Sequence, residues 1–405
     1  MKYEFSARAH TLLSSPLLSI RTQTRRGTLI SLAEELPAEE LFPLSLLAEA
    51  ASNVISANAT ALQYGDPAGY GPLREWLTGD WFRGKGVNVA GGGVLLTTGS
   101  QQAVDLLARV YIDPGDRVLV EHPTSPGCLQ ALRMQGALII PVQGDHEGLD
   151  PEHLREQIRK YRPKMLFATP SFTNPSGILW SLQRRNEVLE LCSAHDVLIV
   201  EDDSYGDLHF EKYDLPPAKK YPSLYALENV SEGGHVLYIG SFSKTVAPAL
   251  RTGWATGSPE LISMMAAAKG MADWQSSSLN QQLLHHLLDV SAFDLREHIA
   301  LLNREYHTRL KLMAELLKRP AWKDSSYHLP KGGMFLWVML PPGLEANSLL
   351  KCALGKGVAF MPGTLCSAEG GGNYIRLNFS HPGRDELLLG MNLMSEAVKE
   401  FTARN

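Results

Sequence analysis

The chain has 405 residues, of which 44% are hydrophobic and 20% are charged, and its formal net charge is −5. This composition is typical of an ordinary globular protein, and it excludes a disordered chain and a strongly basic nucleic-acid binder. The small negative charge also gives no reason to expect binding to an anionic membrane surface.

The cysteines and the longest apolar runs bear on the cellular location. The four cysteines form no CxxC pair, and none lies beside a histidine at metal-ligand spacing, so we expect neither a disulfide framework nor a metal site. The first ten residues lack the apolar core of a secretory signal, and no run reaches the ~18 apolar residues of a membrane span. We therefore expect a cytoplasmic protein without a membrane partner.

Short apolar runs follow a first segment, residues 1–50, that predicts polar helix and loop. Each run is apolar throughout, which is typical of parallel strands buried on both faces. Helical patterns lie between the runs, so the region up to residue 256 predicts an α/β domain. The runs are Val94–Thr98, Arg117–Val120, Ala137–Val142, Met165–Thr169, Val197–Val200 and His235–Gly240, and the helices are Gln101–Tyr111, Cys128–Gln135 and Leu182–His195.

The pattern changes after residue 285. A long amphipathic helix, Leu295–Leu317, is followed by a strand candidate at Gly332–Leu340 and by further short strands and helices. We predict three units: a large domain over residues 51–285, a smaller α+β domain over residues 286–405 that closes on the substrate, and an N-terminal segment, 1–50, that packs with the smaller domain.

The residues that follow the predicted strands are candidates for a ligand site, because open α/β sheets bind ligands outside the carboxyl ends of their strands. After Val94–Thr98, Ser100 and Gln101 open a helix whose free N–H groups and dipole favour a phosphate. The alternative is that Ser100 is simply a helix N-cap. After Met165–Thr169, Asn174 can present its amide to a ligand oxygen, although Asn-Pro and Ser-Gly also favour an ordinary turn.

Three carboxylates, Glu201, Asp202 and Asp203, follow Val197–Val200. Two of them can hold a divalent metal ion, as in Mg²⁺ enzymes. Alternatively, one carboxylate pairs with a buried cation and the others face solvent. Tyr205, three residues beyond Asp202, can point into the same site.

The last predicted strand of this region is followed by Ser241, Ser243, Lys244 and Arg251. A lysine beside a buried strand is costly unless it is used, and the serines and the arginine supply donors for an anion. The alternative is that Lys244 is a solvated loop lysine. One ligand uses all of these strand-end groups. Pyridoxal 5′-phosphate (PLP) needs a lysine for a Schiff base, a carboxylate on its ring nitrogen, donors to its phenolate oxygen and an anion cradle.

These motifs make the chain resemble the fold-type I PLP enzymes, and within them the class I/II aminotransferases. The nearest branch holds the 2-aminoadipate and kynurenine aminotransferases, together with the aminotransferase-like domain of MocR regulators. The resemblance implies a large domain with a mostly parallel sheet between helices and a smaller α+β domain. The matching segments are ALQYGDPAGYGPLREWL (61–77), TTGSQQAVDLL (97–107), NPSG (174–177), EDDSYGDL (201–208), SFSKTVAPALRTGW (241–254), PKGGMFLWV (330–338) and NYIRLNFS (373–380).

The resemblance also implies the catalytic roles. Lys244 would form the Schiff base and move a proton between the substrate's Cα and the cofactor's C4′. Asp202 would pair with the pyridinium nitrogen and keep it protonated. Asn174 and Tyr205 would hydrogen-bond the 3′-oxygen, and Tyr205 counts with Lys244 and Asp202 as a catalytic residue.

The remaining implied contacts concern the phosphate and the substrate. Tyr64 would reach the phosphate from the neighbouring subunit, which implies a homodimer with composite active sites. Arg376 would grip the substrate α-carboxylate as a bidentate fork, and Asn174 would lie beside the substrate. The phosphate ligands would be Ser100, Gln101, Ser241, Ser243 and Arg251.

The chain departs from the family pattern near the substrate. Glu34 and Glu35 replace a Gly pair, Ser125 replaces an aromatic ring that stacks on PLP, Thr173 replaces a glutamine and Cys366 replaces a phenylalanine. We expect Glu34 or Glu35 to contact the substrate side chain, to disfavour acidic side chains and to favour cationic or hydrogen-bond-donating ones. The alternatives are sequence drift at these positions and a solvated segment in which the two glutamates touch nothing.

We predict a PLP-dependent aminotransferase that moves an amino group from an amino acid to a 2-oxo acid. The alternative is a PLP-dependent lyase, oxidase or cyclase in a biosynthetic pathway, which the substitutions at Ser125 and Glu34–Glu35 motivate. A third hypothesis is a PLP-sensing domain of the MocR kind. We expect it less, because the aminotransferase pattern already begins at Ile30–Pro43 and leaves no room for a preceding winged-helix module.

Overall fold

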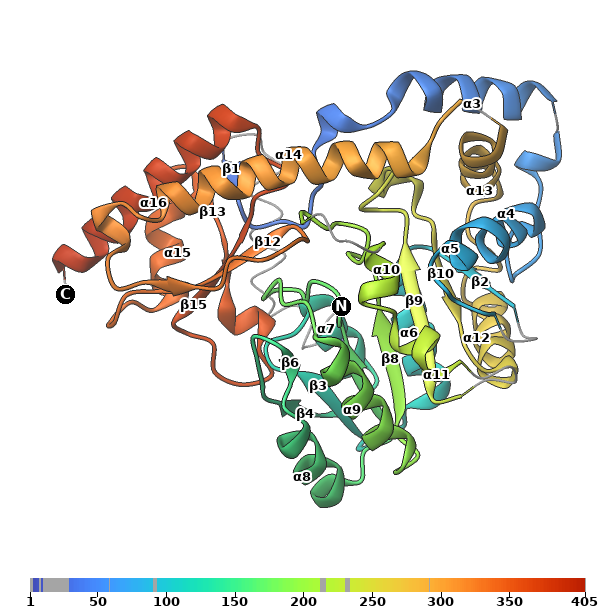
Figure 1. Cartoon of the computed structure of the whole chain (residues 1–405), viewed down its shortest axis with the longest axis horizontal. Helices are drawn as coiled ribbons and strands as arrows, with labels where there is room; N and C mark the ends of the chain where they lie inside the picture. The colour runs from blue at the N-terminus through green and yellow to red at the C-terminus, as the bar shows by residue number, and fades with distance from the viewer. Residues whose placement is uncertain are drawn as a thin grey trace.

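The computed structural model describes residues 3–6, 9, 29–57, 59–89, 93–211, 216–229, 234–290 and 292–404. Much of the predicted segment 1–50 therefore lies outside the described residues. Within the described chain, the largest sheet has seven strands (Figure 1). Their order is β2 (Leu95–Thr97), β10 (Gly253–Thr256), β9 (Val236–Ser241), β8 (Leu198–Asp202), β7 (Met165–Ala168), β3 (Arg117–Glu121) and β4 (Leu138–Val142).

This large sheet is mostly parallel. β10 pairs antiparallel with both β2 and β9, so β2 and β9 point the same way, and all the other pairings in the sheet are parallel. The carboxyl ends of β2, β3, β4, β7, β8 and β9 therefore lie at one edge. Each predicted apolar run holds one of these strands, while β10 was not predicted as a separate strand.

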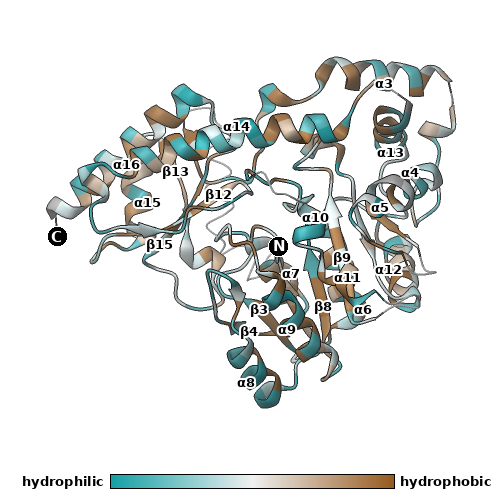
Figure 2. Cartoon of the chain, viewed as in Figure 1, coloured by the Kyte–Doolittle hydropathy of each residue, from teal (hydrophilic) through white to brown (hydrophobic). Residues whose placement is uncertain are grey.

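Both faces of the large sheet are buried, which explains why its strands are apolar throughout (Figure 2). Leu119, Leu166 and Ile199 point into one hydrophobic core, and their neighbours Val118 and Val200 point into the other. One core is covered by α6 (Ser100–Tyr111), α7 (Pro126–Met134) and α12 (Pro259–Ala272). The opposite core is covered by α4 (Gly71–Trp76), α8 (Pro151–Tyr161), α9 (Leu182–Ser193), α11 (Leu224–Glu228) and α13 (Ser278–His285).

The C-terminal part of the chain forms a smaller antiparallel sheet. Its order is β11 (Ser326–Tyr327), β12 (Phe335–Met339), β15 (Tyr374–Asn378) and β14 (Met361–Pro362). β1 (Ile30–Ser31) pairs in parallel with β13 (Val358–Ala359), so the chain just after residue 29 lies against this part. The helices that pack here are α15 (Ala346–Gly355) and α16 (Arg384–Arg404). α3 (Leu44–Ala57), at the top right of Figure 1, packs against α13 of the large part instead.

One long helix, α14 (Leu295–Leu316), runs between the two parts (Figure 1). Asp294 caps it by accepting hydrogen bonds from the backbone N–H groups of Arg296 and Glu297, which are unpaired donors at any helix start. Leu295 and Ile299 pack in a core of the large sheet, whereas Leu302 and later residues pack in the core of the small sheet. The helix is thus shared by both cores.

These observations confirm the predicted fold class, an α/β protein with a large, mostly parallel sheet and a smaller α+β part. The boundaries at residues 50 and 285 stay predictions.

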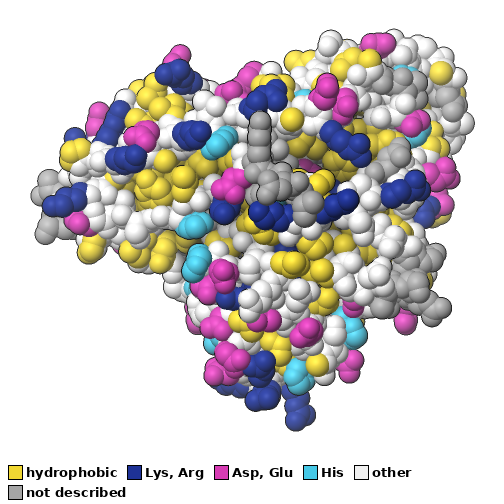
Figure 3. All heavy atoms as spheres, viewed as in Figure 1, with side chains coloured by type: hydrophobic (Ala, Val, Ile, Leu, Met, Phe, Trp, Pro, Cys, Tyr) yellow, Lys and Arg dark blue, Asp and Glu magenta, His cyan; other side chains and the backbone are white. Residues whose placement is uncertain are grey.

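None of the helices in the described ranges is long and apolar enough to cross a membrane. On the face drawn in Figure 3, Lys and Arg side chains are interspersed with Asp and Glu.

A close backbone approach links the large sheet to the start of α6. A Cβ atom on Gly253 in β10 would lie 2.7 Å from the carbonyl carbon of Gly99 and 2.8 Å from the backbone nitrogen of Ser100. Those atoms belong to backbone, which cannot move aside as a flexible side chain would. Glycine at position 253 therefore fixes how closely the first turn of α6 lies against the sheet.

We predict that Gly253→Ala destabilises the protein by about 1–3 kcal/mol, the usual cost of overpacking a tight site. Urea unfolding followed by circular dichroism measures the change. Gly355→Ala is the matched control, because a Cβ atom at Gly355 meets nothing within 4 Å. Equal stability of the two variants would contradict the importance of the Gly253 contact.

Candidate active site

A cavity of about 540 Å³ lies at the carboxyl ends of β2, β8 and β9. It is the expected place for a ligand in an open α/β sheet. Most of the predicted site residues line it, although they come from five separate parts of the sequence. They are Glu34, Glu35, Ser100, Gln101, Ser125, Asp202, Tyr205, Ser241, Ser243, Lys244 and Arg251.

One end of the cavity is built to hold an anion. Ser100 is the first residue of α6, and the N-cap position belongs to Gly99, where no side chain caps the helix. The N–H groups of that first turn and the helix dipole thus face the cavity end without a capping side chain, so the alternative in which Ser100 is the N-cap does not hold. The Ser241 and Ser243 hydroxyls lie 2.9 Å apart, and Arg251 Nη1 lies 3.4 Å from the Ser243 hydroxyl.

Gly99 is needed for this arrangement. Its φ of 76° is in the left-handed region, and a Cβ atom there would lie 2.5 Å from Arg251 Nη2. The guanidinium also donates to the backbone carbonyl of Thr98 at 3.1 Å. Arg251 is therefore held against the start of α6, where its charge adds to that of the helix terminus.

The three consecutive carboxylates serve three different purposes. Glu201 accepts the backbone N–H groups of Leu224 and Tyr225 at the start of α11. Asp203 pairs with Lys85 at 3.3 Å beside a second cavity, of about 310 Å³. Of these three carboxylates, only Asp202 lines the 540 Å³ cavity. The described residues contain no group of three His, Cys, Asp or Glu side chains that could hold a metal ion, so the divalent-metal alternative has no support there.

Asp202 accepts hydrogen bonds from the backbone N–H and the hydroxyl of Ser204, at 3.0 and 2.5 Å. Burial raises the pKa of Asp202 to about 6, although these two bonds oppose the rise. Ser204 was not singled out from the sequence, and it also bridges Asp202 to the Ser100 hydroxyl at 3.2 Å. The signal was present, since an aspartate commonly binds the backbone two residues on.

Lys244 follows β9 and extends into the same cavity. Its Nζ donates to the backbone carbonyl of Glu35 at 2.7 Å and lies 6.0 Å from the centre of the Tyr205 ring. Burial lowers the pKa of Lys244, against the opposing charge of Glu35. A lowered pKa increases the fraction of neutral amine, which is the nucleophilic form. The structure therefore does not support the alternative of a solvated loop lysine.

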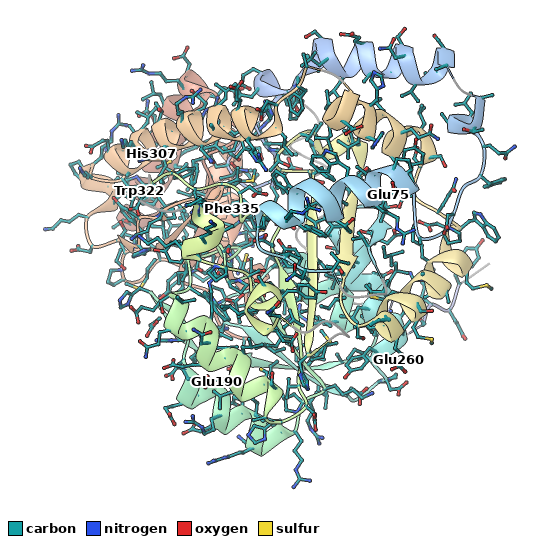
Figure 4. All side chains as sticks on the ribbon, turned by 45° about the vertical axis from the view of Figure 1, so that its right-hand side comes forward. Glu75, Glu190, Glu260, His307, Trp322 and Phe335 are labelled. Carbon is teal, nitrogen blue, oxygen red and sulfur yellow. The ribbon has the colours of Figure 1, made fainter. Side chains whose placement is uncertain are left out.

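Asn174 and Arg376 adjoin the cavity without lining it. Asn174 Nδ2 donates to the Tyr205 hydroxyl at 3.2 Å, and Arg376 Nη1 donates to Asn174 Oδ1 at 2.7 Å. The Arg376 guanidinium stacks 4.1 Å from the centre of the Phe335 ring, which lies near the middle of the molecule in Figure 4. Glu121, at the end of β3, anchors the loop before Asn174 by accepting the Thr169 backbone N–H at 2.6 Å.

Glu35 completes this network. Its Oε1 accepts Arg376 Nη1 at 2.9 Å and Asn174 Nδ2 at 2.8 Å, and its Oε2 lies 3.4 Å from the Tyr205 hydroxyl. Burial alone would raise the pKa of Glu35, but Arg376, Lys244 and the hydrogen bonds outweigh it and lower the pKa to about 2. Glu35 is therefore ionised at neutral pH and touches the predicted carboxylate-binding arginine itself, a contact that the sequence did not indicate.

The other predicted positions differ in their surroundings. Glu34 accepts a hydrogen bond from the Ser31 hydroxyl at 3.5 Å, and Ser125 is the N-cap residue of α7 at the cavity wall. Cys366 is buried, which raises its pKa to about 12, and its carbonyl accepts the Thr124 backbone N–H. The Tyr64 side chain is 80% exposed and does not line the cavity of its own chain.

Comparisons with known proteins identify this combination of groups. The family model for aminotransferase class I and II matches residues 29–388. A 2-aminoadipate transaminase of Thermus thermophilus is 37% identical over 98% of this chain and 97% of its own length. An aromatic-amino-acid aminotransferase of Thermococcus litoralis is 32% identical over 98% of this chain and 94% of its own. An HTH-type transcriptional regulator of Bacillus subtilis is 31% identical over 93% of this chain and 75% of its own.

Solved structures give the same result. An α-aminoadipate aminotransferase of Thermus thermophilus, complexed with N-(5′-phosphopyridoxyl)-L-leucine, has a TM-score of 0.89 and 36% identity over 99% of this chain and 98% of its own. A kynurenine aminotransferase of Pyrococcus horikoshii, in complex with pyridoxamine phosphate, has a TM-score of 0.89 and 34% identity, covering 98% and 97%.

The residues present fit PLP. The cavity offers an uncapped helix start, two hydroxyls and a guanidinium for the phosphate, a carboxylate with raised pKa for a pyridinium, and a buried amine. No group of the described cavity lining is out of place for this ligand. The chain belongs to the aminotransferase class I and II family, as a fold-type I enzyme that uses PLP for transamination.

Proposed function

We propose that Lys244, Asp202 and the anion cradle form the PLP site of this aminotransferase. The observation that carries the proposal is that all three line one cavity at the carboxyl edge of the large sheet. When bound, PLP withdraws electrons from the substrate's Cα and so makes its hydrogen acidic. Lys244 holds the cofactor and then, as a free amine with lowered pKa, carries the Cα proton on Nζ. Asp202 holds a proton on the ring nitrogen through its negative charge.

The substrates are an amino acid and a 2-oxo acid. Both carry an α-carboxylate, so a single guanidinium can serve both half-reactions, and Arg376 is the group we assign to it. Asn174 supports this assignment, since it contacts Arg376 and Tyr205 at once. Relatives act on 2-aminoadipate, kynurenine and aromatic amino acids. Glu34 and Glu35 line the cavity here, and their charge favours neutral or cationic substrate side chains over acidic ones.

We also propose a homodimer with composite active sites. Large apolar side chains are exposed on two neighbouring segments, and a hydrogen bond from the Gly65 N–H to the Gln275 side chain joins these segments. These residues are Leu62, Tyr64, Met271 and Trp274, and Met271 is 90% exposed. Exposed patches of this kind mark protein interfaces. In the dimer, Tyr64 reaches the phosphate of the partner subunit.

The cytoplasmic location and the absence of a nucleic-acid partner belong to the same proposal. The formal charge of −5 disfavours binding of a polyanion such as a nucleic acid, and Cys128, Cys192, Cys352 and Cys366 are all free thiols, as in a reducing cytoplasm.

We propose that residues 286–405 act as the unit that closes on the substrate.

The assignment of Lys244 predicts where the cofactor is attached. Borohydride reduces the Schiff-base bond and makes the attachment permanent. Peptide mapping by mass spectrometry after reduction should find the pyridoxyl group on Lys244. The buried Lys269, which lies at the end of α12 and pairs with Asp273, is the internal control. A pyridoxyl group on Lys269 or on any other lysine would refute the assignment.

The raised pKa of Asp202 predicts that a neutral side chain at this position makes the protein more stable but inactive. The folded, cofactor-free protein keeps a proton on Asp202 up to about pH 6, whereas the unfolded chain loses it near the ordinary value of 3.8. The contribution of Asp202 to wild-type stability therefore falls as the pH rises from 4 to 6. We expect Asp202→Asn to raise the melting temperature of the cofactor-free protein at pH 8 by roughly 2 °C or more, and not at pH 4. The variant should lose transaminase activity, and an equal gain at both pH values would contradict the argument.

The composite site predicts complementation between subunits. Lys244→Ala and Tyr64→Ala each impair the protein alone. When the two are mixed and refolded together, half of the dimers are mixed, and each mixed dimer has one complete site. Activity should therefore return to about a quarter of the wild-type value. Gel filtration and tagged pull-down establish that mixed dimers form, and no recovery in those dimers would show that Tyr64 does not act across the interface.

A further inference from the structure

The carboxylate-binding arginine of the proposed function is closed off from the cavity. Arg376 is 0% exposed and does not line the cavity, whereas the Glu35 side chain lines it and is 35% exposed. Glu35 therefore lies between Arg376 and the space that a substrate enters. A substrate α-carboxylate reaches the guanidinium only after the Glu35 carboxylate has moved away.

Glu35 satisfies the same donors that an α-carboxylate would use. One of its oxygens accepts from Arg376 Nη1 and from Asn174 Nδ2, and the other faces the Tyr205 hydroxyl. The remaining Arg376 amino group, Nη2, donates to the backbone carbonyl of Ala33 at 2.7 Å. The chain thus supplies its own carboxylate to the site that we assign to the substrate.

The backbone around Glu35 is fixed, while its side chain is not enclosed. Asn378 Nδ2 donates to the carbonyls of Glu34 and Leu36 at 2.6 and 3.1 Å, and the Ser380 hydroxyl donates to the Leu36 carbonyl at 2.9 Å. These bonds hold the segment against the small sheet. Displacement of Glu35 from Arg376 is therefore a side-chain rotation into the cavity, without movement of the backbone.

We propose that Glu35 determines substrate specificity by competing with the substrate α-carboxylate for Arg376. The inference rests on the proposed role of Arg376. An α-amino acid gains the Arg376 contact only by breaking the Glu35 contact, and the freed carboxylate then stays in the cavity beside Lys244 and the incoming anion. A primary amine without an α-carboxylate breaks no such contact, because Glu35 keeps Arg376 neutralised.

The consequence is an unusual substrate class for this site: primary amines used as amino donors with a 2-oxo acid as acceptor. The reaction balances without an external oxidant, because the amine R–CH₂–NH₂ leaves as the aldehyde R–CHO and the 2-oxo acid leaves as the amino acid. The 2-oxo acid still displaces Glu35 in the second half-reaction. The amine donor therefore binds without contacting Arg376, whereas the 2-oxo acid acceptor binds to Arg376 after displacing Glu35.

The test compares amino donors that differ only in the α-carboxylate. Suitable pairs are phenylalanine with 2-phenylethylamine, leucine with isopentylamine and lysine with 1,5-diaminopentane, and the fastest pair is used. In the wild-type holoenzyme we expect kcat/KM values within about tenfold of each other. Glu35→Gln should raise kcat/KM for the amino acid relative to the amine by about tenfold, through KM of the amino acid. Glu39→Gln, the same change at an exposed position nearby, should leave the ratio as in the wild type.

A binding measurement complements the kinetics. Calorimetry with 3-phenylpropionate, a carboxylate that has no amino group to react, should give a Kd about tenfold lower for Glu35→Gln than for the wild type. An unchanged Kd together with an unchanged amino acid to amine ratio would overturn the inference.

A second variant separates this inference from the proposed function. Arg376→Gln should raise KM for the amino acid more than KM for the amine, so the ratio of the two kcat/KM values shifts toward the amine. If Arg376→Gln leaves this ratio unchanged, the proposed role of Arg376 is wrong. If Arg376→Gln acts as expected while Glu35→Gln does not alter the donor ratio, the role of Arg376 stands and the competition by Glu35 is wrong.

Discussion

The Arg376 guanidinium joins three parts of the chain that are far apart in sequence. It lies on β15 of the small sheet, it contacts Asn174 from the loop after β7 of the large sheet, and it contacts Ala33 and Glu35 from the N-terminal side. A fully buried guanidinium is tolerated only when its charge is paired and its donors are used. Pairing this one side chain therefore requires both sheets and the segment after β1 to meet at one place.

The balance of charge in the cavity follows from that requirement. Lys244, Arg251 and Arg376 are cationic groups around the site, and Asp202 and Glu35 are the nearby anions, whose charges oppose the lowering of the Lys244 pKa by burial. Glu35 partly neutralises Arg376 and Lys244 and stays ionised. Burial and the nearby charges of Asp203 and Glu35 instead raise the pKa of Asp202. The site is thus matched to a ligand that brings both an anionic phosphate and a protonated ring nitrogen.

The sequence predicted the fold, and it predicted that the polar groups after the strands would lie together, because both depend on local patterns; the roles of these groups toward PLP stay predictions. Doubly buried strands are continuous apolar runs, and the groups at their carboxyl ends meet wherever the strands are parallel, so Lys244, Asp202 and Ser100 were found without coordinates. β10 was missed, since its four residues, Gly253–Thr256, carry no run long enough to stand out. The Glu35–Arg376 contact was also beyond sequence reasoning, because it joins residues 341 positions apart through the direction of one side chain.

The way α14 is shared between the two cores has a consequence for how the molecule melts. Its first two turns contribute Leu295 and Ile299 to the large-sheet core, and Tyr306, Leu310 and Met313 belong to the small-sheet core. If either core unfolds, the apolar side chains at one end of α14 are exposed to water. A helix without tertiary packing is only marginally stable in water. Unfolding of one core therefore destabilises α14, and loss of α14 in turn destabilises the other core. The two sheets are therefore expected to unfold as one cooperative unit rather than as separate domains.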